Sequence, residues 1–187
     1  MHQKVFGDKV DKREAIVVTA ARLIHEHGYN NIGIKSILDA LSIPKGSFYH
    51  YFKSKEDLGL AIIDLYIRDT RGCMLQVEKS LSGLKSYFNI FFDRLRELSL
   101  KRGCPVGNLI LELSDENESF RKKLVEWYQV LESWVINILE AESINDASGK
   151  AKALIAAYEG AMLLSKLDKD AIHFELFNKY IFDSIIG

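Results

Sequence analysis

The stretch from Gly33 to Lys55, GIKSILDALSIPKGSFYHYFKSK, constrains the fold of this chain more than any other. Its first half predicts an amphipathic helix over about residues 34–41, because apolar residues recur at i, i+3, i+4 and i+7 (Ile34, Ile37, Leu38 and Leu41). Pro44 then ends this helix and favours a new start, because it pushes the preceding residue out of the α region and suits a first helical position. A second short helix is expected over residues 45–52. Two short helices joined by a tight turn are typical of a helix-turn-helix.

The second predicted helix has one apolar and one polar face. It is too short to be stable alone, so Phe48 and Phe52, four residues apart, are expected to anchor it in a core. The other face carries a cation, hydroxyls and a glycine: Lys45, Gly46, Ser47, Tyr49 and His50. Such small side chains would allow the helix to lie deep in a major groove, with Lys45 on a guanine or a phosphate and Ser47 on a base edge. Tyr49 and His50 are expected on phosphates.

Further polar residues flank these helices. The first helix leaves Lys35 and Ser36 on its solvent side, and Ser54 with an acid three residues later forms a capping box that starts a long helix at Lys55. The N-terminus of that helix is a natural phosphate site. The predicted DNA-binding set is therefore Lys35, Ser36, Lys45, Gly46, Ser47, Tyr49, His50, Lys53 and Lys55.

The order of these parts resembles the TetR family of bacterial transcriptional regulators. The resemblance is carried by a first helix with Ala20, Ala21, Leu23, Ile24 and Gly28-Tyr29, followed by the run IPKGSFYHYFKSKEDL. It covers about the first 65 residues. Gly33 stands where the family usually has a capping threonine, and Pro44 where it often has a serine.

Charge is distributed unevenly along the chain. Residues 1–55 hold nine Lys+Arg against five Asp+Glu, a balance of +4, and the remainder holds 16 against 21, a balance of −5, which together give the net charge of −1. This places the attraction for phosphate in the N-terminal part. No run approaches the roughly 20 apolar residues that span a bilayer, and the first residues lack the apolar core of a signal peptide, so we expect a cytoplasmic protein without a membrane partner.

The whole chain reads as all-α, with no strand alternation of useful length. Helices are expected over about residues 11–27, 34–41, 45–52, 55–79, 84–102, 108–114, 115–142, 148–167 and 170–186. Residues 1–54 are predicted to form a three-helix DNA-binding domain with the helix-turn-helix. Residues 55–187 are predicted to form a helical ligand-binding and dimerisation domain.

Small residues near the C-terminus suggest a contact with a second chain. Ala157, Gly160 and Ala161, with Phe182 in the last apolar run, predict that the last two helices pack against their copies in a four-helix interface. A dimer would set two recognition helices about 34–36 Å apart, on a palindrome. The alternative is that these residues only ease packing inside one protomer.

Aromatic residues of the second part suggest a small-molecule site. Phe88, Phe91, Trp127, Tyr128 and Tyr158 could line a cavity for an inducer, although ordinary core packing explains any one of them as well. No histidine, cysteine or serine is set in a catalytic or metal-binding pattern, so neither an enzyme nor a cofactor is expected.

Cys104 is a sharper clue to the inducer. It follows Lys101, Arg102 and Gly103 and precedes Pro105, so nearby cations would lower the pKa of its thiol. The segment Gly103–Leu109 also resembles a TetR branch that includes the N-ethylmaleimide reductase repressor. That resemblance implies that Cys104 is a reactive cysteine and that Lys166 lies near it. The alternative is a small cysteine that only packs.

Two functions remain open from the sequence. The first is a homodimeric repressor that binds double-stranded operator DNA and is released by a small-molecule or electrophilic inducer. The second is a helical protein-interaction module without DNA binding.

Overall fold

The computed structural model describes residues 11–186, in which every regular element is helical and no strand occurs, so the predicted all-α class is confirmed. By their internal contacts the residues form two compact units, one up to Leu65 and one from Tyr66. A single helix, α3 (Lys55–Met74), begins in the first unit and ends in the second.

Unit 1 is built from α1 (Lys12–His27), α2 (Ile34–Ala40), a short 3-10 helix η1 (Lys45–His50) and the start of α3. Asp11 caps α1 by accepting the Arg13 N–H at 3.0 Å, and Gly28 ends it with a φ of 89°. The core combines aliphatic residues of α1 and α2 with two aromatic rings: Ile16, Ala20, Ile24, Ile37, Leu38, Phe48 and Phe52 are all buried.

The second helix of the helix-turn-helix begins at the expected residue but is a 3-10 helix that ends at His50. Its bonds span three residues, from the Ser47 N–H to the Pro44 carbonyl and from the Tyr51 N–H to the Phe48 carbonyl, each at 2.9 Å. Such tight turns are used in short pieces. The predicted helix over residues 45–52 therefore ends two residues earlier than expected, at His50, and Phe48 and Phe52 are both buried, as the sequence predicted.

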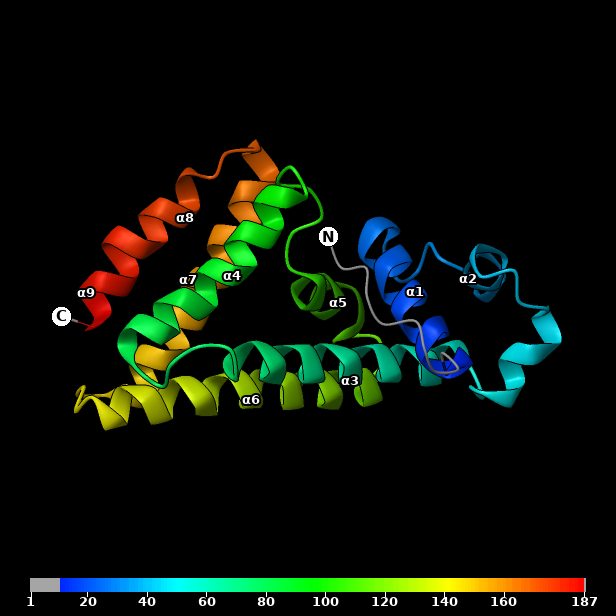
Figure 1. Ribbon diagram of the computed structural model, residues 1–187, viewed down its shortest axis with the longest axis horizontal. Helices are drawn as coiled ribbons and strands as arrows, with labels where there is room; N and C mark the ends of the chain where they lie inside the picture. Colours follow the sequence, from blue (N-terminus) through cyan, green and yellow to red (C-terminus); the bar gives the residue numbers. More distant parts are fainter. Residues whose placement is uncertain (1–10, 187) are drawn as a thin grey trace. The chain divides into compact units, whose positions relative to one another are not determined.

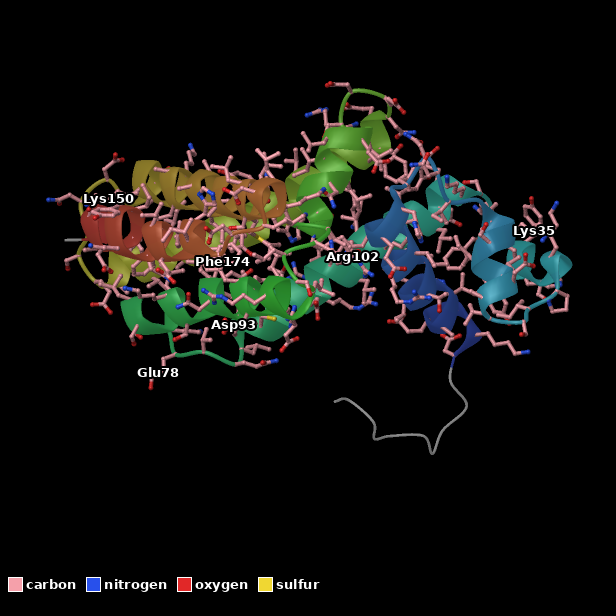
Figure 2. All side chains as sticks on the ribbon, turned by 90° about the horizontal axis from the view of Figure 1, so that it is seen from above. Lys35, Glu78, Asp93, Arg102, Lys150 and Phe174 are labelled. Atoms are coloured by element: carbon pink, nitrogen blue, oxygen red, sulfur yellow. The ribbon has the colours of Figure 1, made fainter. Side chains whose placement is uncertain are left out.

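Unit 2 contains α4 (Leu81–Glu97), α5 (Pro105–Leu113), α6 (Glu118–Ala141) and α7 (Ala147–Asp168). A C-terminal helical run follows, made of α8 (Ile172–Leu176), a π-helical segment η2 (Phe177–Phe182) and α9 (Asp183–Ile186). α7 packs on α6 and α4, and the C-terminal run returns alongside α7 (Figure 1). Figure 2 shows Phe174 among the helices of this unit, where its ring stacks on that of Phe92 with centroids 4.2 Å apart.

The largest boundary errors lie around α4. α3 ends at Met74, not near residue 79, after Gly72 has weakened its last turn. Ser80 caps α4 by accepting the Gly83 N–H at 3.1 Å, so Gly83 lies inside the helix that it was expected to precede. The helix ends at Glu97 because Ser99 is left-handed, with φ 54°, and the Leu100 N–H bonds the Leu95 carbonyl at 2.9 Å, a Schellman motif.

The remaining differences follow from caps and from one irregular segment. Asn117, not Asp115, caps α6, because its Oδ1 accepts the N–H groups of Ser119 at 2.8 Å and Phe120 at 3.2 Å. α5 begins at Pro105, earlier than expected, with Cys104 as its cap. The final helix begins at Ile172, and the π-helical segment interrupts it.

Gly83 is required by close packing rather than by flexibility. A Cβ atom there would lie only 1.9 Å from the Glu78 carbonyl oxygen, and a backbone atom cannot move aside cheaply. We expect Gly83→Ala to lower the free energy of unfolding by about 1–3 kcal/mol. Gly72→Ala is the matched control, because a Cβ at this helical glycine meets nothing within 4 Å and should raise stability by about 1 kcal/mol. Denaturant unfolding followed by circular dichroism measures both, and equal effects would contradict the packing explanation.

Candidate DNA-binding face and regulatory cavity

The polar face predicted for the second helix of the helix-turn-helix is exposed in the structure. Lys45, Gly46, Tyr49 and His50 are exposed on η1 and Ser47 is partly exposed, whereas Phe48 is fully buried. A Cβ on Gly46 would meet nothing within 4 Å, so packing within the protein does not require glycine there. η1 thus brings five predicted DNA-binding residues together on a turn that is anchored by one ring.

The other predicted DNA-binding residues differ in their exposure and in the contacts that their side chains make within the protein. Ser36 and Lys53 are exposed, and the Lys35 ammonium pairs with Asp39 on α2. Figure 2 shows Lys35 pointing away from the ribbon. Lys55 is engaged inside unit 1, because its ammonium donates to the Tyr29 carbonyl at 2.7 Å and lies 4.3 Å from the Tyr29 ring centroid. Lys55 therefore fastens the start of α3 to the loop after α1, a role that the sequence reading missed.

A cavity of about 240 Å³ lies in unit 2, where α5 begins beside α7. Its walls are Gly103, Cys104, Gly107, Asn108, Ile110, Leu111, Glu159, Gly160, Leu163 and Lys166. Cys104 and Lys166, paired by the sequence reading, thus line the same space. Gly103 has a φ of 67°, a conformation that favours glycine, and a Cβ there would lie 3.1 Å from the Lys166 side chain.

The electrostatics at Cys104 differ from the expectation. Burial raises the pKa of the Cys104 thiol well above its usual value, and the nearby Glu159 carboxylate raises it further. The Gly107 N–H, which donates to Sγ at 3.2 Å, acts in the opposite direction but is weaker. The idea that neighbouring cations lower this pKa was wrong, because withdrawal from water has the larger effect.

Glu159 is the residue of this cavity that the sequence reading missed. Burial raises its pKa to about 7, and its carboxylate accepts a hydrogen bond from the Cys104 thiol. Its buried Oε1 has no hydrogen-bond partner within residues 11–186. The available signal was its spacing, since Glu159 lies seven residues before Lys166 on α7 and therefore on the same helix face. A Cβ on Gly107 would lie 2.8 Å from Glu159 Oε2, so Gly107 makes room for the carboxylate.

The five aromatic residues predicted to line a ligand cavity do not line this one. Phe88, Trp127 and Tyr158 are buried, and Phe91 and Tyr128 are partly buried. Tyr158 packs on Phe88 with ring centroids 4.9 Å apart, and the Trp127 Nε1–H donates to Thr70 Oγ1 at 2.9 Å, which ties α6 to α3. The alternative of ordinary core packing describes these residues.

The residues predicted at a dimer interface divide into two groups. Ala157 and Gly160 are partly exposed on α7, whereas Ala161 and Phe182 are buried inside unit 2. The two buried residues pack within the protomer, as the alternative interpretation had it. Exposed apolar residues follow the same two elements, namely Leu163, Leu164 and Leu167 on α7 and Ile172, Leu176 and Tyr180 on the C-terminal run.

Two family models match this chain, one in its N-terminal part and one in its C-terminal part. Residues 16–62 match the model of the bacterial regulatory proteins of the tetR family. Residues 80–180 match the model of the LmrA/YxaF-like transcriptional regulator C-terminal domain. Within residues 11–186, no helix combines the length and apolarity needed to cross a membrane.

Individual relatives agree with these matches. The HTH-type transcriptional regulator in the lacX 3' region of Lactococcus lactis subsp. lactis is 32% identical, over 84% of this chain and 85% of that protein. The HTH-type transcriptional repressor NemR of Escherichia coli (strain K12) is 25% identical over 85% of this chain and 86% of its own. The crystal structure of the regulatory protein TetR from Rhodobacter sphaeroides superposes with a TM-score of 0.82, at 26% identity, over 91% of this chain and 96% of that one. The protein belongs to the TetR family, and it is a DNA-binding transcriptional regulator rather than an enzyme.

Phe48 and Tyr49 are adjacent, but the Phe48 ring is buried and the Tyr49 ring is exposed. Substitutions at the two positions can therefore distinguish a contribution to folding stability from a contribution to DNA binding. We expect Phe48→Ala to lower the free energy of unfolding by about 3–5 kcal/mol, because it empties a fully buried site. Tyr49→Ala is the matched control, since this ring is 62% exposed and its loss should cost less than about 1 kcal/mol. Denaturant titrations test both, and an equal loss would mean that the anchor has been misplaced.

Proposed function

We propose that the protein is a homodimeric repressor that binds a palindromic operator through η1 and α2 and releases it when a small-molecule or electrophilic inducer reaches the cavity beside Cys104. Residues 1–54 would recognise DNA in the cytoplasm, and residues 55–187 would dimerise and respond to the inducer. The observation that carries the proposal is the exposed polar face of η1, held by the buried Phe48.

The face of η1 provides both kinds of contact that operator recognition requires. Lys45 and Ser47 have the donors that read base edges in the major groove. Tyr49 and His50, with Lys35, Ser36 and Lys53 nearby in sequence, supply phosphate contacts that fix the register. Lys55 is a weaker candidate, because a phosphate would compete with the Tyr29 carbonyl for its ammonium.

Dimerisation is supported by an apolar surface on unit 2. Ala157, Gly160 and Leu164 recur at helical spacing on α7, and Leu167 is 76% exposed. A Cβ on Gly160 would meet nothing within 4 Å, so a second chain could approach this helix closely. Exposed apolar residues that follow two adjacent elements are typical of a protein interface. Two copies of α7 and the C-terminal run would form the four-helix contact and set two η1 helices on one palindrome.

The inducer response is proposed to act through the surroundings of Cys104. This residue caps α5, and its thiol lies close enough to Tyr66 on α3 to affect the pKa of that phenol. A group attached to Cys104, or a molecule bound beside it, would displace the start of α5 and press on α3. Because α3 is continuous with unit 1, it would carry the displacement toward the DNA-binding residues. A ligand produces such a shift when it binds one of the two conformations more tightly.

The repressor function predicts distinct losses at two positions of η1. On a promoter fragment from its own operon, Lys45→Ala should weaken operator binding by about 5- to 100-fold and relax base preference, as the loss of a base contact does. Tyr49→Ala should weaken binding to all sequences alike. Fluorescence anisotropy at several salt concentrations measures both effects.

Lys122→Ala is the control for charge, because it removes one exposed cation from α6 and should leave the affinity within about twofold. Absence of a salt-dependent shift for the wild-type protein would contradict the proposal and favour an interaction module without DNA binding.

The proposed dimer predicts that the same substitution has different effects on the oligomeric state at two exposed leucines. Leu164→Glu should convert the dimer to a monomer, because it places a charge in the proposed apolar contact. Leu75→Glu is the control, since this leucine is 85% exposed and follows the end of α3, so it belongs to neither of the two elements that form the proposed face. Sedimentation equilibrium distinguishes the two, and a wild-type monomer at micromolar concentration would contradict the interface.

A further inference from the structure

The cavity holds a thiol and a carboxyl group that interact directly in a mostly apolar space. The Cys104 S–H donates to the Glu159 carboxylate, and Glu159 Oε1 remains buried without a partner among residues 11–186. Ile110, Leu111 and Leu163 supply apolar walls. A buried carboxyl oxygen without a hydrogen bond is costly, and it persists where a site has a use for it.

The other polar side chains of the cavity are those of Lys166 and Asn108. The Lys166 ammonium lies 3.5 Å from Asn108 Oδ1, which is too long for a strong bond, so the ammonium remains available to a second acceptor. The Asn108 amide NH₂ group is held by the Arg102 carbonyl at 2.7 Å, which fixes the orientation of that side chain. A compact molecule with one carbonyl oxygen would match an apolar wall with one donor.

We infer that Glu159 is the proton acceptor through which the Cys104 thiol adds to a small α,β-unsaturated carbonyl compound in this cavity, with its oxygen toward Lys166. The inference deepens the proposed inducer response and rests on it. It assigns to Glu159 a chemical step, not only a place in the wall.

The step balances without a further reactant. The carboxylate takes the proton of the thiol as sulfur forms a bond to the β-carbon of the alkene, and the electron pair of the double bond moves toward the carbonyl oxygen. The Glu159 carboxyl then returns its proton to the α-carbon, which restores the carboxylate and leaves a saturated thioether. The thiol is thus added across the double bond, and nothing is oxidised or reduced.

Burial explains why the carboxylate, not a cation, must assist this thiol. The thiol is a poor source of free thiolate at neutral pH, because burial and Glu159 both raise its pKa. A carboxylate with a pKa raised to about 7 is a better base than an ordinary one and still ionises near neutrality. The titratable groups that face this pair are Tyr66 from α3, Tyr87 from α4, and Tyr158 and Lys166 from α7, and Arg94 on α4 acts on Tyr158. The pKa of each of the three phenols is raised by burial, so these phenols stay neutral in the same range.

The test is the rate at which methyl vinyl ketone modifies Cys104, followed by mass spectrometry of the intact protein between pH 5.5 and 9.5. In the wild-type protein the rate should rise with an inflection near pH 7, where Glu159 becomes the carboxylate. Glu159→Gln keeps the shape of the side chain but cannot accept the proton. At pH 7.5 we expect this variant to react about 100-fold more slowly.

Two variants control the experiment. Glu132→Gln removes another largely covered carboxylate, on α6, and should react as the wild-type protein does. Cys104→Ser should not be modified, which excludes the second cysteine, Cys73, as the reacting group. Thermal unfolding checks that each variant is folded.

The competing electrostatic effect makes the test decisive. Removal of the negative charge of Glu159 lowers the pKa of the thiol, so a carboxylate that merely suppresses the thiolate would make Glu159→Gln react equally fast or faster. Either result would overturn the inference, as would a wild-type rate with no inflection near pH 7. Operator binding measured on the same samples separates this outcome from the proposed function. Modified protein that still holds DNA would contradict the inducer response and leave the role of Glu159 intact.

Discussion

Burial of the Phe48 ring is the interaction on which the rest of the recognition unit depends. A six-residue 3-10 helix has almost no stability of its own, and η1 keeps its geometry because Phe48 and Phe52 are fixed in the core of α1, α2 and α3. Lys55 reinforces this arrangement from the start of α3 by binding the Tyr29 carbonyl. Because these buried rings hold the backbone of η1, its polar residues already have a fixed position before DNA binds. Little conformational entropy is then lost on binding.

Unit 2, in contrast, holds two ionisable groups in surroundings that oppose their ionisation. Its core is a dense set of aromatic rings around Phe88, Phe92 and Tyr158, yet a carboxyl group and a thiol are held together at the edge of that core. Burial opposes ionisation of both groups, and three close-fitting positions support them: Gly103 admits the Lys166 side chain, Gly107 admits Glu159, and Pro105 starts α5 directly after Cys104. A protein retains such groups where they are useful, because packing alone would favour apolar residues.

The sequence was enough to predict the family, the all-α class and the exposed face of η1, because these depend on local spacing. Caps and close contacts were harder. Gly83 looked like a break between helices, but it lies inside α4, because Ser80 caps this helix and the Glu78 backbone leaves no room for a side chain at residue 83. Ser99 ends the same helix in a left-handed conformation that serine adopts less often than glycine.

The cavity beside Cys104 was predicted only in part. Cys104 and Lys166 were paired through resemblance, and they line one cavity. The five aromatic residues do not line this cavity, and the sequence could not tell the two cases apart, because a run of rings at helical spacing looks the same in a core and in a pocket. Glu159 was missed because its importance comes from burial beside a thiol 55 positions earlier in the chain. Its spacing of seven residues from Lys166 indicates a shared helix face, but it does not indicate the contact with Cys104.

The central claim is that two copies of η1, each fixed by its buried phenylalanine, read one symmetric DNA site. DNase I footprinting of the DNA upstream of the gene tests it most directly. The account predicts one protected segment whose sequence is two-fold symmetric, with half-site centres about one helical turn (34–36 Å) or a multiple of it apart. Protection of a single half-site, or none at low ionic strength, would contradict it.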